Sequence, residues 1–193
     1  MVTGVILAGG KSVRFGTNKA LQQFRGKRLI EHAIDLLRPF CDDLLVVAND
    51  LGPYFGLDIA LAQDIIAHQG PLGGIYTALL FSPCEWIFAR ATDMPFLVPG
   101  LAAAMLAARE GFDAVVPRVG DFHEPLMALY HRRCCPAIAD VLEHEGERKI
   151  TNFYKKIKVR YFSEEEWCAI DPGGLSFRNV NTPEDLAAID GPA

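Results

Sequence analysis

The hydrophobic residues of this chain fall into short continuous runs, which alternate with longer segments where apolar positions recur at helical spacing. Short continuous runs are typical of strands buried on both faces, and the longer periodic segments are typical of helices with one buried side. The runs predict strands over Val5–Ala8, Leu44–Ala48, Ile59–Ala62, Trp86–Ala89, Ala114–Pro117 and Leu126–Tyr130, and an edge strand over Val159–Phe162.

The periodic segments predict helices between and after these strands. They cover Leu29–Leu37, Gly73–Phe81, Val98–Arg109, Pro136–Glu145, Lys149–Tyr154 and Pro183–Ile189. The last has the clearest start, because Thr182 suits the cap position and Pro183 the first helical position. Strands alternating with helices predict an α/β fold, a Rossmann-like three-layer sandwich with a mostly parallel central sheet. No repeat or linker divides the chain, so we expect a single domain over residues 1–193.

The composition is that of a folded domain. The 193 residues are 50% hydrophobic and 22% charged, which is enough for a full core and too apolar for a disordered chain. The net charge of −5 argues against a general binder of nucleic acid, which is usually basic. No apolar stretch is long and charge-free enough to span a bilayer, so we expect neither membrane nor nucleic acid as a partner.

The cysteines favour a reducing compartment. There are five, at Cys41, Cys84, Cys134, Cys135 and Cys168. The odd number and the lack of a C-x-x-C motif predict neither a disulfide framework nor a zinc knuckle. The chain also starts without the positively charged segment of a signal peptide, so we expect a cytoplasmic protein. The adjacent Cys134 and Cys135 are interpreted as small apolar residues at a helix start rather than as a redox pair.

A glycine pair follows the first strand and is followed by cations. Gly9 and Gly10 come directly after the apolar run, and Lys11, Arg14 and Lys19 follow them. Glycine lets backbone N–H groups approach a phosphate, and basic side chains neutralise its charge. The segment therefore predicts a polyphosphate site. Its spacing is neither G-x-G-x-x-G nor that of a P-loop, which excludes the usual nicotinamide-binding oxidoreductase.

Polar residues follow the predicted strands at the edge where ligands bind in such sheets. Asp93 follows the strand at Trp86, and a carboxylate beside a polyphosphate suggests a Mg²⁺ ligand. A turn or helix-cap role before Pro95 is the alternative. Asp64 follows another strand, where it suits either the base or ribose of a nucleotide or the capping of a loop.

Two further segments allow both a binding role and a purely structural one. Gly73 and Gly74 belong to a glycine-rich turn before a helix, which suits a ligand phosphate or ordinary turn chemistry. Asn181 precedes the last predicted helix, where its amide suits a substrate, a metal or an Asx-turn. His123 and Glu124 suggest an acid–base pair, although a histidine in a surface loop explains them equally simply.

A basic run lies near the end of the chain. It contains Arg148, Lys149, Lys155, Lys156, Lys158 and Arg160. Such a run is usually a solvated face, and the alternative is a docking surface for an anionic second substrate.

Taken together, these segments resemble one family. Leu7–Lys19 is similar to the L-A-G-G-x-S-x-R-[MF]-G-x-[DN]-K signature of the molybdenum cofactor guanylyltransferases, the MobA type. Gly70–Gly74 resembles the G-P-L-x-G turn of that family, and Thr92–Phe96 resembles its C-D-[MT]-P-[FY] metal motif. Pro125–Tyr130 and Asn181–Leu186 resemble its P-[LT]-x-A-L and N-T-P-E-[DE]-L blocks. The blocks stand in the family order and cover nearly the whole chain.

The resemblance implies a nucleotide-diphospho-sugar transferase-like fold and a reaction. GMP would pass from GTP to molybdenum-bearing molybdopterin, with release of pyrophosphate and a requirement for Mg²⁺. It implies that Asp93 holds Mg²⁺ and that Arg14 and Lys19 act with it in catalysis. The implied binding set is Leu7, Ala8, Gly9, Gly10, Lys19, Asp64, Gly73, Gly74, Asp93, Asn181 and Arg148.

The resemblance assigns a part to several of these residues. Leu7, Ala8 and Gly9 would contact the base and ribose, and Arg148 would lie near the pterin pocket. Two departures stand out: Val47 replaces the Asn of some members, and Thr92 replaces the more usual Cys before the aspartate.

Other functions remain open from the sequence. A related nucleotidyltransferase could use CTP or a sugar-phosphate acceptor, although Gly9-Gly10 in place of Ala-Gly resembles the guanylyl type. A non-catalytic nucleotide-binding protein on the same fold is a rival of another class. Cofactor-handling proteins would be partners, and a monomer is favoured.

Overall fold

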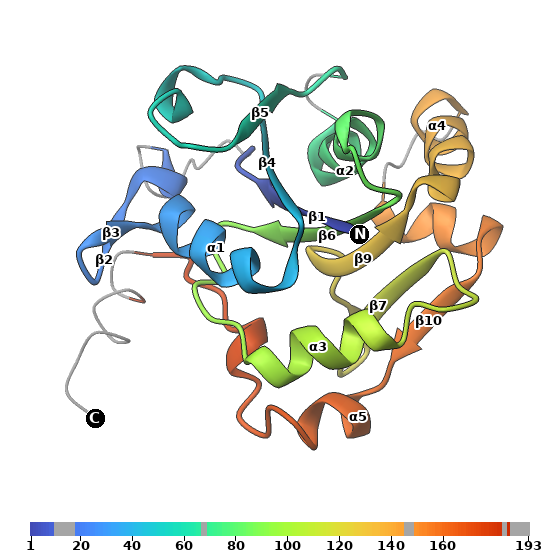
Figure 1. Cartoon of the computed structure of the whole chain (residues 1–193). Coiled ribbons are helices and arrows are strands. Elements are labelled where there is room, and N and C mark those ends of the chain that lie inside the picture. Colours follow the sequence, from blue (N-terminus) through green and yellow to red (C-terminus); the bar gives the residue numbers. More distant parts are fainter. Residues whose placement is uncertain (10–17, 67–68, 145–148, 183–184, 186–193) are drawn as a thin grey trace.

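The fold is a central sheet with helices on both of its faces (Figure 1). It is known from a computed structural model, which describes residues 1–9, 18–66, 69–144, 149–182 and 185. The strand order is β10-β7-β9-β6-β1-β4-β5, with β8 paired to β7. The strands are β1 Val2–Leu7, β4 Asp43–Ala48, β5 Ala60–Gln63, β6 Trp86–Ala91, β7 Ala114–Val119, β8 Phe122–His123, β9 Met127–His131 and β10 Val159–Phe162.

Most neighbouring strands in this sheet are parallel. β1 pairs in parallel with β4 and β6, β4 with β5, and β10 with β7. β9 runs antiparallel to both of its neighbours, β6 and β7. Because β9 runs the other way, its amino end lies at the edge where the parallel strands end. That edge therefore receives loops from almost the whole sheet.

Helices cover the two faces of the sheet in separate groups. One face carries α1 Leu29–Leu37, α3 Pro99–Ala107 and α5 Glu164–Cys168. The other face carries α2 Gly70–Phe81, α4 Cys135–His144 and the 3₁₀ helix η5 Ile150–Lys156. In the described part of the chain, no helix has the length and apolar character needed to cross a membrane.

The two cores explain why the strands are continuously apolar. Successive side chains of a strand point to opposite faces. In β1, Ile6 packs into the core under α1 and α3, while Val5 and Leu7 pack into the core under α2 and α4. Residues on both faces are thus buried, and the three-layer sandwich predicted from the sequence is confirmed.

The predicted elements agree closely with the observed ones. The helix over Leu29–Leu37 and the strand over Val159–Phe162 have the predicted bounds. α2 begins at Gly70 rather than Gly73, because Pro71 suits the first turn of a helix. The segment predicted as a helix from Lys149 is the 3₁₀ helix η5. The predicted helix over 183–189 lies outside the described residues, apart from Asp185.

Short elements were not predicted. They are the hairpin of β2 Gln23–Phe24 and β3 Lys27–Arg28, the strand β8, the helix α5, and the 3₁₀ helices η1 Lys19–Leu21, η2 Arg38–Phe40, η3 Gly52–Tyr54, η4 Arg132–Cys134 and η6 Leu175–Phe177. Two- and three-residue elements carry too few positions for a hydrophobic period. α5 did carry a signal, because Ser163 and Glu166 form a capping box.

Candidate active site

The predicted site residues that the structure describes gather at the edge of the sheet where the parallel strands end. Ala8 and Gly9 follow β1, Asp64 follows β5, and Asp93 follows β6. Asn181 reaches the same edge from the other end of the chain, through a backbone contact in which Val180 N donates to Asp93 O at 2.8 Å.

Lys19 joins two of these groups. Its Nζ donates to Asp93 Oδ2 at 3.1 Å and to Asn181 Oδ1 at 3.2 Å. The Lys19 side chain is 13% exposed and that of Asp93 is 30% exposed, so the ion pair is half-buried. A carboxylate oxygen and an amide oxygen thus converge on one positive charge. The sequence predicted all three residues, and the structure brings them together.

A tyrosine that the sequence did not single out holds the Lys19 segment against the first strand. Asn18 caps η1, with its side-chain oxygen accepting from Ala20 N at 3.1 Å. Asn18 Nδ2 donates to Tyr54 Oη at 2.9 Å, and Tyr54 Oη donates to Ala8 O at 3.3 Å. Burial raises the pKa of Tyr54, so its hydroxyl stays a donor at neutral pH. A tyrosine in a loop follows no spacing rule, which is why Tyr54 could not be predicted from the sequence.

Asn181 is fixed by the turn that follows it. Asp185 Oδ2 accepts from Asn181 N at 2.7 Å and from Thr182 N at 2.9 Å. Asp185 N donates to Thr182 Oγ1 at 3.1 Å, so Thr182 caps this turn as predicted. The bond from Asn181 N is the main reason that the pKa of Asp185 lies below its usual value. Asn181 therefore has both a local turn role and a contact with Lys19.

Asp64 connects β5 to the start of α2. Its Oδ1 accepts from Thr77 Oγ1 at 2.9 Å and from Ile66 N at 3.3 Å. A Cβ on Gly73 would lie 3.3 Å from Asp64 Oδ2 and 3.2 Å from Ile66 O, so this position leaves little room for a side chain. A Cβ on Gly74 would lie 3.1 Å from Leu7 Cδ2. Asp64 thus caps a loop here, and its contact with a nucleotide remains a prediction.

Three predicted site residues, Gly10, Arg14 and Arg148, lie outside the described residues. The basic run is described in part. Lys156 pairs with Asp140, and Arg160 pairs with Glu166. These two cations already have acidic partners on the surface, as in a solvated face.

The described part of the site does not contain the donor set of a structural metal centre. Within the described ranges, no group of three or more His, Cys, Asp or Glu side chains is placed to hold a metal ion. Mg²⁺ does not need such a group, because it commonly takes one or two protein oxygens together with water and substrate phosphates. Asp93 and Asn181 supply two oxygens that converge on one cation, which fits this pattern.

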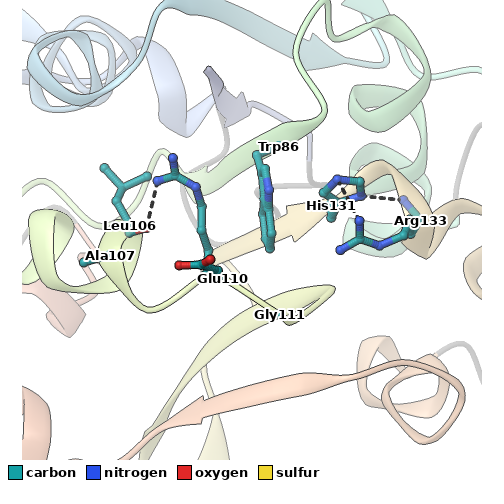
Figure 2. Close-up of a pocket in the computed structure, with 8 residues that line it drawn as sticks. Trp86, Leu106, Ala107, Glu110, Gly111, His131 and Arg133 are labelled. Atoms are coloured by element: carbon teal, nitrogen blue, oxygen red, sulfur yellow. Dashed lines mark hydrogen bonds between the residues drawn. The ribbon is translucent and has the colours of Figure 1, made fainter.

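A cavity of about 470 Å³ lies away from these residues. Figure 2 shows Trp86 beside His131, with Glu110 and Arg133 on the wall. Trp86 begins β6 and His131 ends β9, so the cavity opens at the opposite edge of the sheet. Trp86 and His131 meet edge to face with ring centroids 5.1 Å apart. This cavity is thus separate from the cluster of Lys19, Asp93 and Asn181.

Comparison with known proteins gives one family. Residues 4–159 match the family model described as the MobA-like NTP transferase domain. A molybdenum cofactor guanylyltransferase from Desulfosudis oleivorans is 40% identical over 187 residues, which are 96% of this chain and 92% of that protein. The protein of the same name from Vibrio campbellii is 34% identical, over 95% of this chain and 92% of its own length.

Solved structures give the same fold. The molybdopterin-guanine dinucleotide biosynthesis protein A from Archaeoglobus fulgidus superposes with a TM-score of 0.80 at 28% identity, over 96% of this chain and 95% of that chain. A 2-C-methyl-D-erythritol 4-phosphate cytidylyltransferase from Thermus thermophilus has a TM-score of 0.67 at 15% identity, over 95% of each chain. The second likeness concerns the fold alone.

Proposed function

The chain belongs to the MobA-like NTP transferase family, and we propose that it transfers GMP from GTP to molybdenum-bearing molybdopterin, releasing pyrophosphate. The observation that carries the proposal is the cluster of Lys19, Asp93 and Asn181 at the sheet edge. These residues come from motifs that run in family order along a chain matched almost end to end by guanylyltransferases. The product would be the molybdopterin guanine dinucleotide cofactor.

We propose Mg²⁺ as the cofactor, with Asp93 and Asn181 as the protein groups that hold it. The support is the convergence of their oxygens on the Lys19 ammonium. When bound, Mg²⁺ would neutralise charge on the phosphates of GTP. Asp93 is the stronger of the two ligands, because a carboxylate carries charge and an amide does not.

In the proposed reaction, the site residues position the two substrates and neutralise the negative charge of their phosphates. The terminal phosphate of molybdopterin is anionic near neutral pH, so its oxygen attacks the α-phosphorus of GTP without a general base. The bond from the α-phosphorus to the bridging oxygen breaks, and pyrophosphate leaves with the electron pair. We assign Lys19 to the departing phosphates, and the family motif implies that Arg14 acts with it. A cation at about 4 Å is worth about 4 kcal/mol at an effective dielectric constant of about 20.

The nucleotide lies over the half of the sheet that carries β1, β4 and β5. Leu7, Ala8 and Gly9 contact the base and ribose, and Asp64 with the start of α2 lines the same side. Both backbone polar groups of Ala8 already have partners in the protein, since Ala8 N donates to Val47 O at 2.9 Å and Ala8 O accepts from Tyr54. Leu7 is likewise paired with β4 and β6, so we assign recognition of the base to the backbone of Gly9, which follows the strand.

The proposed reaction also identifies the substrates and the expected partner proteins. GTP and molybdopterin are the substrates, and proteins that handle the cofactor are the expected partners. A cytoplasmic location and a monomeric state stay predictions from the sequence.

The proposed function is tested by comparing the four nucleoside triphosphates as substrates. Purified protein is incubated with molybdenum-loaded molybdopterin, Mg²⁺ and GTP, CTP, ATP or UTP in turn, and pyrophosphate and the dinucleotide product are measured. We expect GTP to exceed the others by at least about 100-fold in kcat/KM, because a site that hydrogen-bonds polar groups of its substrate discriminates more strongly than the roughly 100-fold of an apolar pocket. Faster transfer from CTP would identify a cytidylyltransferase. Binding of GTP without pyrophosphate release would identify a binding protein.

A further inference from the structure

Arg90 is a charged residue in the middle of a buried strand. It stands in β6 between Ala89 and Ala91, opposite Ile6 of β1 and Met127 of β9. Its exposed fraction is 0%, and it is the largest fully buried side chain among the described residues. Burying a charge destabilises the folded state unless hydrogen bonds or opposite charges compensate it, so we looked for the groups that compensate Arg90.

The guanidinium lies under the loop that carries Asp93. Arg90 Nη2 donates to Met94 O at 2.8 Å and also to Phe96 O. These two carbonyls belong to the residues that follow Asp93, so one nitrogen ties two points of the loop. On the other side, Asp93 O accepts from Val180 N. The loop is therefore held from the sheet and from the C-terminal segment.

The charge of Arg90 acts on two carboxylates. Burial lowers the pKa of Arg90 to about 10, so it stays a cation at neutral pH, with Asp93 and Glu124 as the acidic groups that favour the charged form. Its Nε and Nη1 have no hydrogen-bond partner among the described residues. The hydrogen bonds of this cation are thus to backbone carbonyls, while its charge acts on Asp93 and Glu124.

Glu124 lies in the loop before β9, where the charges of Asp93 and Arg90 act on it. Ala91 N donates to Leu126 O at 3.0 Å, which continues the antiparallel pairing of β6 and β9 beyond the sheet. Glu124 Oε1 accepts from Leu126 N at 3.1 Å, and burial, followed by the charge of Asp93, raises the pKa of Glu124. One buried cation thus lies beneath two carboxylates at the site.

We propose that Arg90 is a positioning residue for nucleotidyl transfer, which fixes the Asp93 loop through Met94 O and Phe96 O and balances the charges of Asp93 and Glu124. This rests on the proposed function, in which the Asp93 carboxylate acts in the reaction. Without the guanidinium, two buried carbonyls lose their donor and the loop relaxes. A displacement of about 1 Å at a reacting group lowers rates by about 100-fold.

The test uses Arg90→Met and Arg90→Lys in the full chain. Methionine keeps an apolar side chain of similar length without donors, and lysine keeps the charge with one nitrogen. Mn²⁺, a probe that also reports by electron paramagnetic resonance, is titrated into each protein with GTP bound, beside steady-state GMP transfer and thermal unfolding. Arg109→Met is the matched control, because Arg109 also donates to a carbonyl, Leu106 O at 2.7 Å, at the opposite edge of the sheet.

We expect Arg90→Met to weaken Mn²⁺ binding about 10-fold and GMP transfer about 100-fold, with Arg90→Lys between it and the parent. Arg109→Met should change neither. If Arg90→Met does not fold, Arg90→Lys still decides, since parental Mn²⁺ affinity and activity in that variant would overturn the proposal.

A double-mutant cycle separates this proposal from the proposed function. In an Asp93→Ala background, Arg90→Met should add less than about a threefold loss, because a residue that acts through Asp93 has nothing left to position. A full additional loss would mean that Arg90 acts on the fold alone and would overturn the positioning role. Normal transfer by Asp93→Ala alone would instead refute the assignment of Asp93.

Discussion

At the residue scale, the ammonium of Lys19 lies between two oxygens that the proposed Mg²⁺ would also use. Lysine and metal cannot share that position, so we expect Lys19 to turn to the phosphates when the nucleotide and metal bind. Lys19 thus neutralises Asp93 before the substrate arrives and the phosphates afterwards.

Replacing Lys19 tests this exchange. Lys19→Ala should raise the KM for GTP by about 10- to 100-fold, because a half-buried cation is lost from the phosphate site. Unfolding temperature should change by only a few degrees, since a partly exposed ion pair contributes little to stability. Lys27→Ala is the control, because Lys27 also pairs with an aspartate, Asp35, on an exposed surface. Unchanged GTP kinetics for Lys19→Ala would remove it from the site.

Among the three clustered residues, we expect the Asp93 carboxylate to contribute most to the rate of GMP transfer. Asp93→Ala should slow GMP transfer by about 10³-fold, equivalent to about 4 kcal/mol of transition-state stabilisation. Asp50→Ala is the control: Asp50 follows β4 at the same edge, where it accepts from Gly52 N in a local turn. Steady-state rates at several Mg²⁺ concentrations would show the difference, and near-parental turnover by Asp93→Ala would contradict a metal role.

What the sequence could predict at this scale depended on local motifs. Lys19, Asp93 and Asn181 stand in segments with turn or capping chemistry of their own, so they could be selected one at a time. Their contact could not be predicted, because 162 positions separate Lys19 from Asn181. Arg90 could have been noticed in the sequence, because it is a cation inside the apolar run of β6. Only the structure shows the carbonyls to which it donates hydrogen bonds.

At the element scale, the first turn of α2 requires glycine at position 73, because neighbouring atoms leave little room for a side chain there. A methyl group on Gly73 would meet Gln69 Cβ at 3.0 Å as well as Ile66 and Asp64. The loop before α2 would have to shift, and Asp64 with it.

Gly73→Ala therefore should weaken GTP binding by about 10-fold and destabilise the fold by about 1–3 kcal/mol, the usual cost of overpacking. Gly56→Ala is the matched control, because a Cβ there meets nothing within 4 Å. Isothermal titration with GTP and denaturant unfolding would compare the two. Parental affinity in Gly73→Ala would show that this turn is remote from the nucleotide.

The hydrophobic pattern predicted where strands lie but not their directions. β9 has the same continuous apolar character as its parallel neighbours, because both of its faces are buried too. Its reversal follows from a short connection, through β8, that returns the chain directly to the edge it left. The missed hairpin of β2 and β3 has two residues in each strand, too few to show alternation.

At the scale of the whole molecule, stability should depend on buried carboxylates that accept backbone bonds. Burial would raise the pKa of Asp171, but bonds from Ser176 N at 2.8 Å and Leu175 N at 2.9 Å outweigh it and leave the pKa below its usual value. A pKa that is lower in the folded state contributes stability above the unfolded value of about 3.9, and that contribution is lost as the pH falls through the folded value.

Asp171→Asn should consequently lower the free energy of unfolding by about 1 kcal/mol at pH 7 and much less at pH 3. Urea unfolding at both pH values would measure the difference. Asp58→Asn is a control, because Asp58 is an exposed residue outside this turn. An equal loss at pH 3 and pH 7 would show that the charge of Asp171 is not what stabilises the turn.

The contact of Lys19 with Asn181 also bears on how the protein is made. Synthesis proceeds from the amino end, so the ribosome completes the sheet strands, the Asp93 loop and the Lys19 segment well before it adds Asn181. A nascent chain or a prematurely terminated product that stops short of residue 181 holds Lys19 but lacks its amide partner. On the proposed roles, we therefore expect products that stop before residue 181 to lack GMP transfer even where the sheet has formed.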